Sequence, residues 1–292
     1  MAAHFLTGLE LEDRLEDLLE RAAELKADRP AAGREALSGR SVGLVFERPS
    51  TRTRVSFEVG TAEMGGTPVV LRADELQLSR GESIGDVGRV LSRYLAAIAI
   101  RSGSHDRVAE LAAAASVPVI NALTPLHHPC QAIADLLTLR ERFGSLAGLR
   151  VAYIGDGNNV ARSLALLGGA AGVEVVSSSP PGFELEPEAG AELIGDPHEA
   201  VRGADAVYTD VWVSMGEDAE AESKREALAP YRVDEELIAA ASDRAIVMHC
   251  LPAHPGEEIT EGVLYGERSA VFDQAENRLH AQKALLEMLI AS

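Results

Sequence analysis

The sequence predicts an α/β protein made of two doubly wound parallel-sheet domains. Short apolar segments alternate with amphipathic segments of helical period, which is the pattern of parallel strands covered by helices on both faces. This alternation starts afresh near residue 149. The chain has 292 residues, which is longer than a domain with a single hydrophobic core commonly is. Hydrophobic residues make up 46% of it, which is enough to fill two cores. We expect a first domain over residues 1–143, a second over 144–276, and a C-terminal helix over 277–292 that packs back on the first domain.

The first domain is expected to begin with an amphipathic helix over residues 9–25, because leucines and alanines recur at spacings of three and four. Short apolar segments that suit buried strands follow this helix, at residues 41–46, 68–72, 97–101 and 117–121. Helices are expected between and after these strands, at residues 51–64, 83–94, 106–115 and 129–143. Gly65 and Gly66 close the first of them.

The second domain is expected to begin with a strand over residues 149–154. A glycine turn at Gly155-Asp156-Gly157 follows this strand and leads into a helix from about residue 160 to 171. Further strands are expected at residues 173–177, 206–208 and 245–249, and the final helix at 277–290 is apolar enough to dock on a core.

Composition limits the partners and the compartment. The net charge of −19 and a pI near 4.8 argue against nucleic acid or an anionic membrane surface as a partner, since either would be repelled. Only three of the 27 basic residues are lysines, against 46 acids, which favours adaptation to high salt, with arginine-rich codon usage as the alternative. Two cysteines fit a reducing cytosol, and the chain shows no leader and no membrane-length apolar run. We therefore expect a cytoplasmic protein.

The segment from Ser50 to Arg54 is the strongest local indication of a ligand. It follows the apolar run that ends at Phe46, and it alternates hydroxyls with guanidiniums at the expected start of a helix. Unpaired N–H groups and partial positive charge at a helix N-terminus suit an anion, and arginine forks match phosphate oxygens in pairs. Ser50 or Thr51 is expected to cap the helix. A capped helix with solvated arginines is the alternative.

Further polar clusters follow the expected strands, at the edge where parallel sheets bind ligands. Counting the segment just described, the polar clusters are Ser50–Arg54, Arg101, His127–Gln131, Gly155–Asn159, Asp210–Gly216 and His249–Pro252. Taken alone, Arg101 is also explained by a salt bridge to a helix, and Asp210 by a capping role in the loop that follows it. The convergence of these clusters on one edge favours a site.

Two other interpretations of these clusters are weaker. The segment from Gly155 to Asn159 resembles half of a dinucleotide fingerprint, but Val160 replaces the third glycine, so a tight turn with free asparagine side chains fits better. His127, His128, Cys130, His249 and Cys250 could assemble zinc, but they lack the paired spacing of zinc ligands. We expect no metal.

Four motifs in order resemble the ornithine carbamoyltransferase family. They are Ser50-Thr-Arg-Thr-Arg54, His128-Pro-Cys-Gln131, Asp210-Val-Trp-Val-Ser-Met-Gly216 and His249-Cys-Leu-Pro252. The resemblance spans nearly the whole chain. The first two motifs are shared with aspartate carbamoyltransferase, whereas the last two select ornithine. The resemblance implies an enzyme of arginine metabolism and the urea cycle that transfers the carbamoyl group of carbamoyl phosphate to L-ornithine, giving citrulline and phosphate.

The resemblance also implies where the substrates bind. The first domain binds carbamoyl phosphate, the second binds ornithine, and the active site lies in the cleft between them. The residues implied for carbamoyl phosphate are Ser50, Thr51, Arg52, Thr53, Gln77, Arg101, His128, Gln131, Cys250, Leu251 and Arg278. Gln77 matches a residue that family members lend to a neighbouring subunit, which implies a homotrimer with shared active sites.

The residues implied for ornithine are Asn159, Asp210, Ser214 and Met215. Catalysis is expected from Arg101 and His128 at the carbonyl oxygen and from Asp210 and Cys250 at the amine, without metal or organic cofactor. Three alternatives remain: another amine acceptor such as aspartate, putrescine or an acylated ornithine; a nicotinamide dinucleotide-binding dehydrogenase; and an inactive binding protein with the same pocket.

Overall fold

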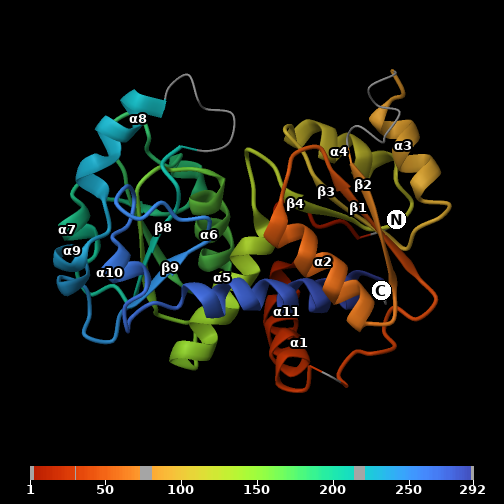
Figure 1. The fold of residues 1–292 in the computed structure, drawn as a ribbon, viewed down its shortest axis with the longest axis horizontal. Coiled ribbons are helices and arrows are strands. Elements are labelled where there is room, and N and C mark those ends of the chain that lie inside the picture. The colour runs from red at the N-terminus through yellow and green to blue at the C-terminus, as the bar shows by residue number, and fades with distance from the viewer. Residues whose placement is uncertain (1–2, 30, 73–80, 214–220, 291–292) are drawn as a thin grey trace. The chain divides into compact units, whose positions relative to one another are not determined.

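The computed structural model describes residues 3–29, 31–72, 81–213 and 221–290 (Figure 1). The chain divides into two compact units, residues 1–137 with 276–292, and residues 138–275. Three residues implied by the resemblance, Gln77, Ser214 and Met215, lie outside the described residues. Among the described residues, no helix combines the length and the apolar character needed to cross a membrane.

The first unit is built on a four-stranded sheet of order β2-β1-β3-β4, in which all neighbours are parallel. Its strands are β1 (Ser41–Phe46), β2 (Thr67–Arg72), β3 (Ala97–Arg101) and β4 (Val119–Leu123). The sequence placed β4 two residues too early. Pro118 cannot donate to a strand ladder, and the paired strand begins only after it.

Helices cover both faces of this sheet. They are α1 (Leu15–Ala27), α2 (Thr51–Glu63), α3 (Ile84–Leu91), α4 (His105–Ala114), α5 (Pro129–Phe143) and α11 (Val271–Ile290). The crossovers β1-α2-β2 and β2-α3-β3 run in opposite directions along the sheet, so right-handed connection places α2 and α3 on opposite faces. α11 lies beside α2, where Gly60 faces Leu279 and Lys283. The predicted helix at residues 9–25 begins instead as a 3-10 helix, Leu9–Arg14, because Leu11 leaves helical geometry.

The second unit contains a five-stranded parallel sheet of order β7-β6-β5-β8-β9. Its strands are β5 (Arg150–Ile154), β6 (Glu174–Ser178), β7 (Glu192–Leu193), β8 (Ala206–Thr209) and β9 (Ile246–His249). The sequence did not predict β7, whose two residues are both exposed and carry no apolar run. The helices are α6 (Asn159–Ala170), α7 (Pro197–Ala200), α8 (Ala221–Leu228), α9 (Glu235–Ala239) and α10 (Glu261–Leu264), with 3-10 turns η3 (Pro187–Ala189) and η5 (Ala229–Tyr231).

α11 starts six residues before the predicted position. Its first turn is held on β9, because the Gln274 side chain accepts a hydrogen bond of 2.9 Å from the backbone N–H of His249, and Val271 is fully buried. The boundary between the two units falls inside α11, and also inside α5.

Each sheet has one point at which the strand order reverses. In the first unit this point lies between β1 and β3, and in the second between β5 and β8. Ligands of open parallel sheets bind beyond the carboxyl ends of the strands at such points. The segment Ser50–Arg54 and Arg101 follow or end β1 and β3, whereas Gly155–Asn159 and Asp210 follow β5 and β8. The fold therefore brings predicted polar clusters to both switch points.

Candidate active site

The N-terminus of α2 presents the hydroxyl and guanidinium groups predicted to hold an anion. Ser50 occupies the N-cap position in an extended conformation, but its side chain makes no capping hydrogen bond. Ser50 or Thr51 was expected to cap the helix, and Ser50 holds the cap position but lacks the side-chain hydrogen bond. Thr51 is exposed, Arg52 is half-buried and Thr53 is buried. The Ser50 side chain therefore does not occupy the backbone N–H groups in the first turn of this 13-residue helix. Such N–H groups, at the positive end of a helix, are what an anion binds.

Arg278 links three of the predicted residues in one buried network. Its Nη2 donates to Thr53 Oγ1 at 3.0 Å and its Nη1 donates to Gln131 Oε1 at 2.7 Å. The amide of Gln131 in turn donates to Asp135 Oδ1 at 2.8 Å. Arg278 is only 3% exposed. The guanidinium is therefore fixed by side chains of α2 and α5, although the three residues are far apart in the chain.

His128 lies next to these positive charges. Burial lowers the pKa of its imidazole well below the ordinary value, and the charges of Arg278 and Arg101 lower it further. The ring is therefore neutral near pH 7 and can donate a hydrogen bond without adding charge. Burial also raises the pKa of Cys130 to about 12, with Arg278 opposing the rise, so this thiol stays protonated. Cys130 is a packing residue that donates to the carbonyl of Asn121.

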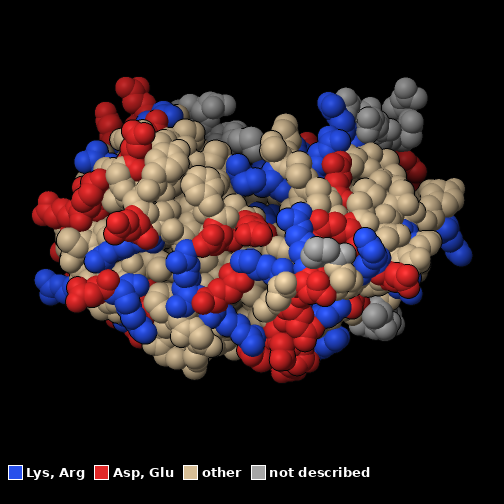
Figure 2. All heavy atoms as spheres, turned by 60° about the horizontal axis from the view of Figure 1, so that its bottom comes forward, with Lys and Arg blue, Asp and Glu red and all other residues tan. Residues whose placement is uncertain are grey.

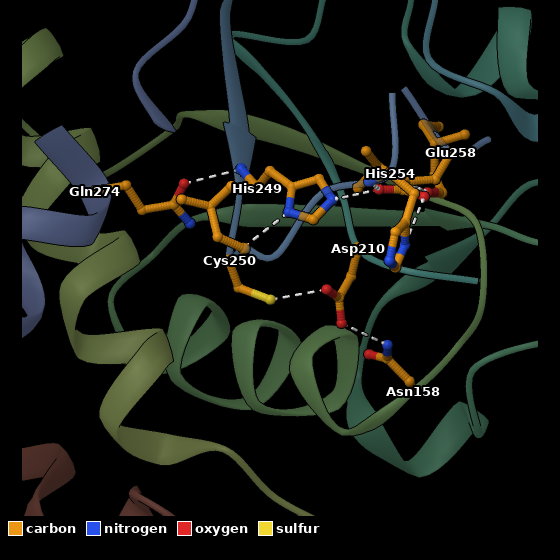
Figure 3. A network of polar contacts seen from close by, with 10 residues as sticks. Asn158, Asp210, His249, Cys250, His254, Glu258 and Gln274 are labelled. Carbon is orange, nitrogen blue, oxygen red and sulfur yellow. Dashed lines mark hydrogen bonds and ion pairs between the residues drawn. The ribbon is translucent and has the colours of Figure 1, made fainter. Parts of the chain in front are cut away.

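Asp210 organises the corresponding cluster in the second unit (Figure 3). One carboxylate oxygen accepts from Asn158 Nδ2 at 2.9 Å, and the other accepts from Cys250 Sγ at 2.8 Å. Asp210 is buried, while Cys250 is half-buried. A carboxylate and a thiol thus face each other beyond β8 and β9, in a position to bind an ammonium group and to receive a proton from it.

Asn158 also caps α6. Its Oδ1 accepts from the backbone N–H groups of Val160 and Ala161, at 2.9 and 3.2 Å, and from the Tyr153 hydroxyl at 3.1 Å. A dinucleotide would need these N–H groups for its pyrophosphate. Asp156, in the same turn, is buried and paired with Lys224 Nζ at 2.8 Å. The turn after β5 is therefore occupied by its own side chains, which weakens the dehydrogenase alternative.

His249 does not face the thiol of Cys250 as a catalytic base would. Its Nδ1 accepts from the backbone N–H of Leu251 at 2.8 Å, and its Nε2 lies 3.1 Å from Glu258 Oε1. Because Nδ1 accepts, the ring carries its single proton on Nε2 and donates to Glu258. Leu251 has a φ of 58°, a strained value for leucine. His249 therefore positions the loop that carries Cys250 and Leu251.

Among the described residues, Asp210, His249 and Cys250 each offer a ligand atom, and these atoms lie within 4.8 Å of one another. The Asp210 and Cys250 atoms bond each other, and both nitrogens of His249 are engaged. A metal bound here would have to break those hydrogen bonds.

The structure groups the predicted residues into two sets. In the first unit, Thr53, Gln131 and Arg278 share a network, and the charges of Arg101 and Arg278 act on His128. In the second unit, Asp210 bonds Cys250, and Asn159 is the first residue of α6. Sequence reasoning missed Asn158 as the partner of Asp210, although it had marked the asparagines after the glycine turn. It also missed Glu258, because two adjacent glutamates look like a solvated surface pair.

Two parallel-sheet units, each with a cluster of charged and hydrogen-bonding groups at its switch point, define the class as a two-domain α/β enzyme. Comparison with known proteins gives the family. The family model described as "Aspartate/ornithine carbamoyltransferase, carbamoyl-P binding domain" matches residues 3–141, and "Aspartate/ornithine carbamoyltransferase, Asp/Orn binding domain" matches residues 147–289. The chain belongs to the aspartate/ornithine carbamoyltransferase family.

Individual relatives agree with this assignment. The chain is 54% identical to the ornithine carbamoyltransferase of Acidothermus cellulolyticus, over 99% of this chain and 97% of the relative. It is 55% identical to the ornithine carbamoyltransferase of a Parafrankia species, over 99% of this chain and 96% of the relative. Among solved structures, ornithine carbamoyltransferase from Pyrococcus furiosus superposes with a TM-score of 0.92 at 45% identity, covering 100% of this chain and 98% of that one. The ornithine carbamoyltransferase from Thermus thermophilus superposes with a TM-score of 0.89 at 44% identity, covering 96% of this chain and 95% of that one.

Proposed function

We propose that this chain transfers the carbamoyl group of carbamoyl phosphate to the δ-amine of L-ornithine, giving L-citrulline and phosphate. The observation that carries the proposal is the Arg278 network beside the N-terminus of α2, because it combines an anion site with fixed donors for a carbonyl group. The relatives that share nearly the whole chain are named as ornithine carbamoyltransferases.

We propose that the first unit binds carbamoyl phosphate. The phosphate would lie at the first turn of α2, held by Ser50, Thr51, Arg52 and Thr53. Arg101 would contact both phosphate and carbonyl oxygen, and neutral His128 would donate to that oxygen. Gln131 would accept from the carbamoyl amide, with Arg278 fixing its orientation. Donors fixed before the reaction stabilise negative charge that develops on the carbonyl oxygen.

We propose that the second unit binds ornithine. The carboxylate of Asp210 would pair with the α-ammonium group, while Asn159, Ser214 and Met215 would hold the α-amino acid end. Cys250 and Leu251 would lie beside the δ-amine and the carbamoyl group. Asp210 and Cys250 already share a hydrogen bond, so a proton leaving the δ-ammonium group has a polar network to enter.

The reaction then follows from the two bound groups. The δ-ammonium loses a proton, and its nitrogen forms a bond to the carbamoyl carbon, placing negative charge on the carbonyl oxygen. The bond between that carbon and the bridging oxygen breaks, phosphate leaves with the electron pair, and the nitrogen loses a second proton. Holding both substrates in place converts a bimolecular addition into an oriented one.

A direct test is citrulline formation by the purified protein. Citrulline should appear only when carbamoyl phosphate and ornithine are both present. A panel of aspartate, putrescine and an acylated ornithine tests the acceptor, and ornithine should be preferred. Faster turnover of another acceptor would retain the family and reject the substrate. Tight nicotinamide cofactor binding without citrulline formation would support the dehydrogenase alternative.

The roles of the two units predict separable defects. Arg52→Ala should abolish carbamoyl phosphate binding, because it removes a charged fork at the anion site. Asp210→Ala should spare carbamoyl phosphate binding and weaken ornithine, since it removes the counter-charge of an ammonium. Calorimetry with carbamoyl phosphate measures the first affinity, and the KM for ornithine reports the second. The reverse pattern would overturn the assignment of the units.

We further propose a homotrimer in which Gln77 of one subunit reaches the phosphate site of its neighbour. The match of the segment Glu75–Glu82 to the family pattern supports this proposal. Light scattering should give three times the chain mass of 30.9 kDa. Mixing an inactive Arg52→Ala chain with an inactive Gln77→Ala chain should restore some activity if sites are shared. A fully active monomer would reject the proposal.

A further inference from the structure

We propose that the loop after β9 contains a second site, a divalent cation site formed by the imidazole of His254 and the carboxylates of Glu257 and Glu258. The three residues lie within five positions of the chain, in the second unit. Carbamoyl transfer as described above uses none of them at the reacting atoms. The site would exist whether or not the chain performs that reaction.

The geometry of the three side chains suits ligands of one ion. Each offers one ligand atom, and these atoms lie within 4.8 Å of one another. His254 Nδ1 and Glu258 Oε2 are 3.8 Å apart, which is too long for a hydrogen bond. Two ligands of a tetrahedral ion at about 2.1 Å are about 3.4 Å apart, so a small adjustment would let both bind one ion. Figure 3 shows the His254 ring pointing toward the Glu258 carboxylate.

Glu258 supplies a buried carboxylate oxygen that needs a partner. The side chain is 0% exposed, and its Oε1 accepts from His249 Nε2 at 3.1 Å and from the backbone N–H of His254 at 2.6 Å. The other oxygen, Oε2, is buried and has no hydrogen-bond partner within the described part of the chain. A buried oxygen of this kind is costly unless something compensates it. A cation bound at Oε2 would compensate the burial of this carboxylate.

Solvent can reach the proposed site through His254, whose side chain is 53% exposed. Glu257 is partly exposed, and its Oε2 accepts from Arg225 Nε at 3.0 Å. One imidazole and two carboxylates, without thiolate, suit ions such as Mn²⁺ or Zn²⁺. Mn²⁺ is the better probe, because it avoids thiolates and so discriminates against the cluster of Asp210, His249 and Cys250.

The test is titration of the full chain with Mn²⁺, followed by electron paramagnetic resonance, at a salt concentration that screens weak binding to the acidic surface. One ion per chain should bind more tightly than the rest. His254→Ala and Glu257→Gln should each weaken this binding about 10-fold or more. Arg225→Gln should strengthen it, because a positive charge beside Glu257 is lost. Circular dichroism checks that each variant is folded.

His198→Ala is the matched control. His198 is an exposed histidine in the same unit, and its acidic neighbours Asp196 and Glu199 are exposed as well. Its replacement, like Cys250→Ser, should leave the tight ion in place. Equal Mn²⁺ binding by His254→Ala and the wild type would overturn the proposal, as would loss of the tight ion in Cys250→Ser alone.

Discussion

The guanidinium of Arg278 connects side chains from two other helices, α2 and α5. It holds the hydroxyl of Thr53 and the amide of Gln131 in fixed orientation, and its charge helps to keep His128 neutral. In the second unit, Asp210 plays the equivalent part for Asn158 and Cys250. In both cases a buried charged group makes short hydrogen bonds to side chains of other elements, which fixes its geometry before a substrate arrives.

Arg278→Lys should raise the KM for carbamoyl phosphate about 10-fold or more. Lysine keeps the charge but lacks the planar fork that reaches Thr53 and Gln131 together, and one hydrogen bond to a charged group contributes about 1.5–3 kcal/mol. Arg54→Lys is the control, since Arg54 pairs with Glu58 on the exposed side of α2. The control should change the KM less than about twofold, because exposed ion pairs contribute little. Equal effects would refute the special role of Arg278.

The low pKa of His128 predicts a loss of stability in acid. Below about pH 6.5 the unfolded chain binds a proton at this residue that the folded chain does not bind, so the free energy of unfolding falls as the pH falls. Between pH 6.5 and 5.5 the wild type should lose up to about 1 kcal/mol more than His128→Gln. Urea unfolding across this range measures the difference. Parallel pH profiles would show that His128 titrates normally in the folded protein.

The helices and turns next to these residues are held in place by side-chain contacts at their ends. Asn158 caps α6, Gln274 ties the first turn of α11 to β9, and the buried pair of Lys224 and Asp156 joins α8 to the turn after β5. Gly157, in that turn, lies against the backbone of the loop after β6. The Asp210 cluster of the second unit thus lies among helix and strand ends that are held by side-chain contacts.

Gly157→Ala should destabilise the second unit and weaken ornithine binding. A Cβ atom there would lie 2.3 Å from the backbone nitrogen of Leu185, and backbone cannot yield as a flexible side chain does. We expect a loss of about 1–3 kcal/mol in the free energy of unfolding and a higher KM for ornithine, since Asn158 is the next residue.

Gly169→Ala, in α6, is the matched control. Nothing lies within 4 Å of its Cβ position, so alanine should stabilise the helix by about 0.5–1 kcal/mol. Both changes are measured by urea unfolding and steady-state kinetics. A Gly157→Ala protein as stable as the Gly169→Ala protein would contradict the close approach.

At the scale of the whole molecule, charge is the dominant feature. The chain carries 46 acidic and 27 basic residues. Figure 2 shows acidic side chains spread over the face in view, with basic side chains among them. Some acidic groups are paired locally, as Glu63 is with Arg29 and Glu257 with Arg225. With all basic residues counted, the net charge is −19. Self-repulsion of that size opposes the compact state.

Salt should therefore stabilise the protein. The screening length falls from about 10 Å at 0.1 M to about 3 Å at 1 M, so repulsion between surface carboxylates should weaken over this range. The thermal midpoint, measured by circular dichroism, should rise by several degrees with sodium chloride. An unchanged or lower midpoint would show that local ion pairs already balance the charge, and would reject adaptation to high salt.

Local patterns in the sequence predicted most of the fold. The strands β1 and β3 and the helix α5 have the predicted bounds, and both units have parallel sheets. One error had a local cause, because Pro118 lies inside the predicted segment and delays β4. The others arose where neighbours outside the local segment decide the structure, as where contacts with β9 start α11 early. The two-residue strand β7 is defined only by its pairing with β6, because its own side chains carry no periodicity.

The sequence by itself determined the alternation of strands and helices and the alternation of hydroxyl and guanidinium groups in Ser50–Arg54, because periodicity and residue chemistry are local properties. Only the tertiary structure decided which distant side chains meet. Thr53 and Arg278 are 225 positions apart, and Asp210 and Cys250 are 40 apart. Such contacts depend on strand order and helix packing, which a local pattern does not contain. The same holds for the partnership of Asn158 with Asp210 and for the burial of Glu258 beside His249 and His254.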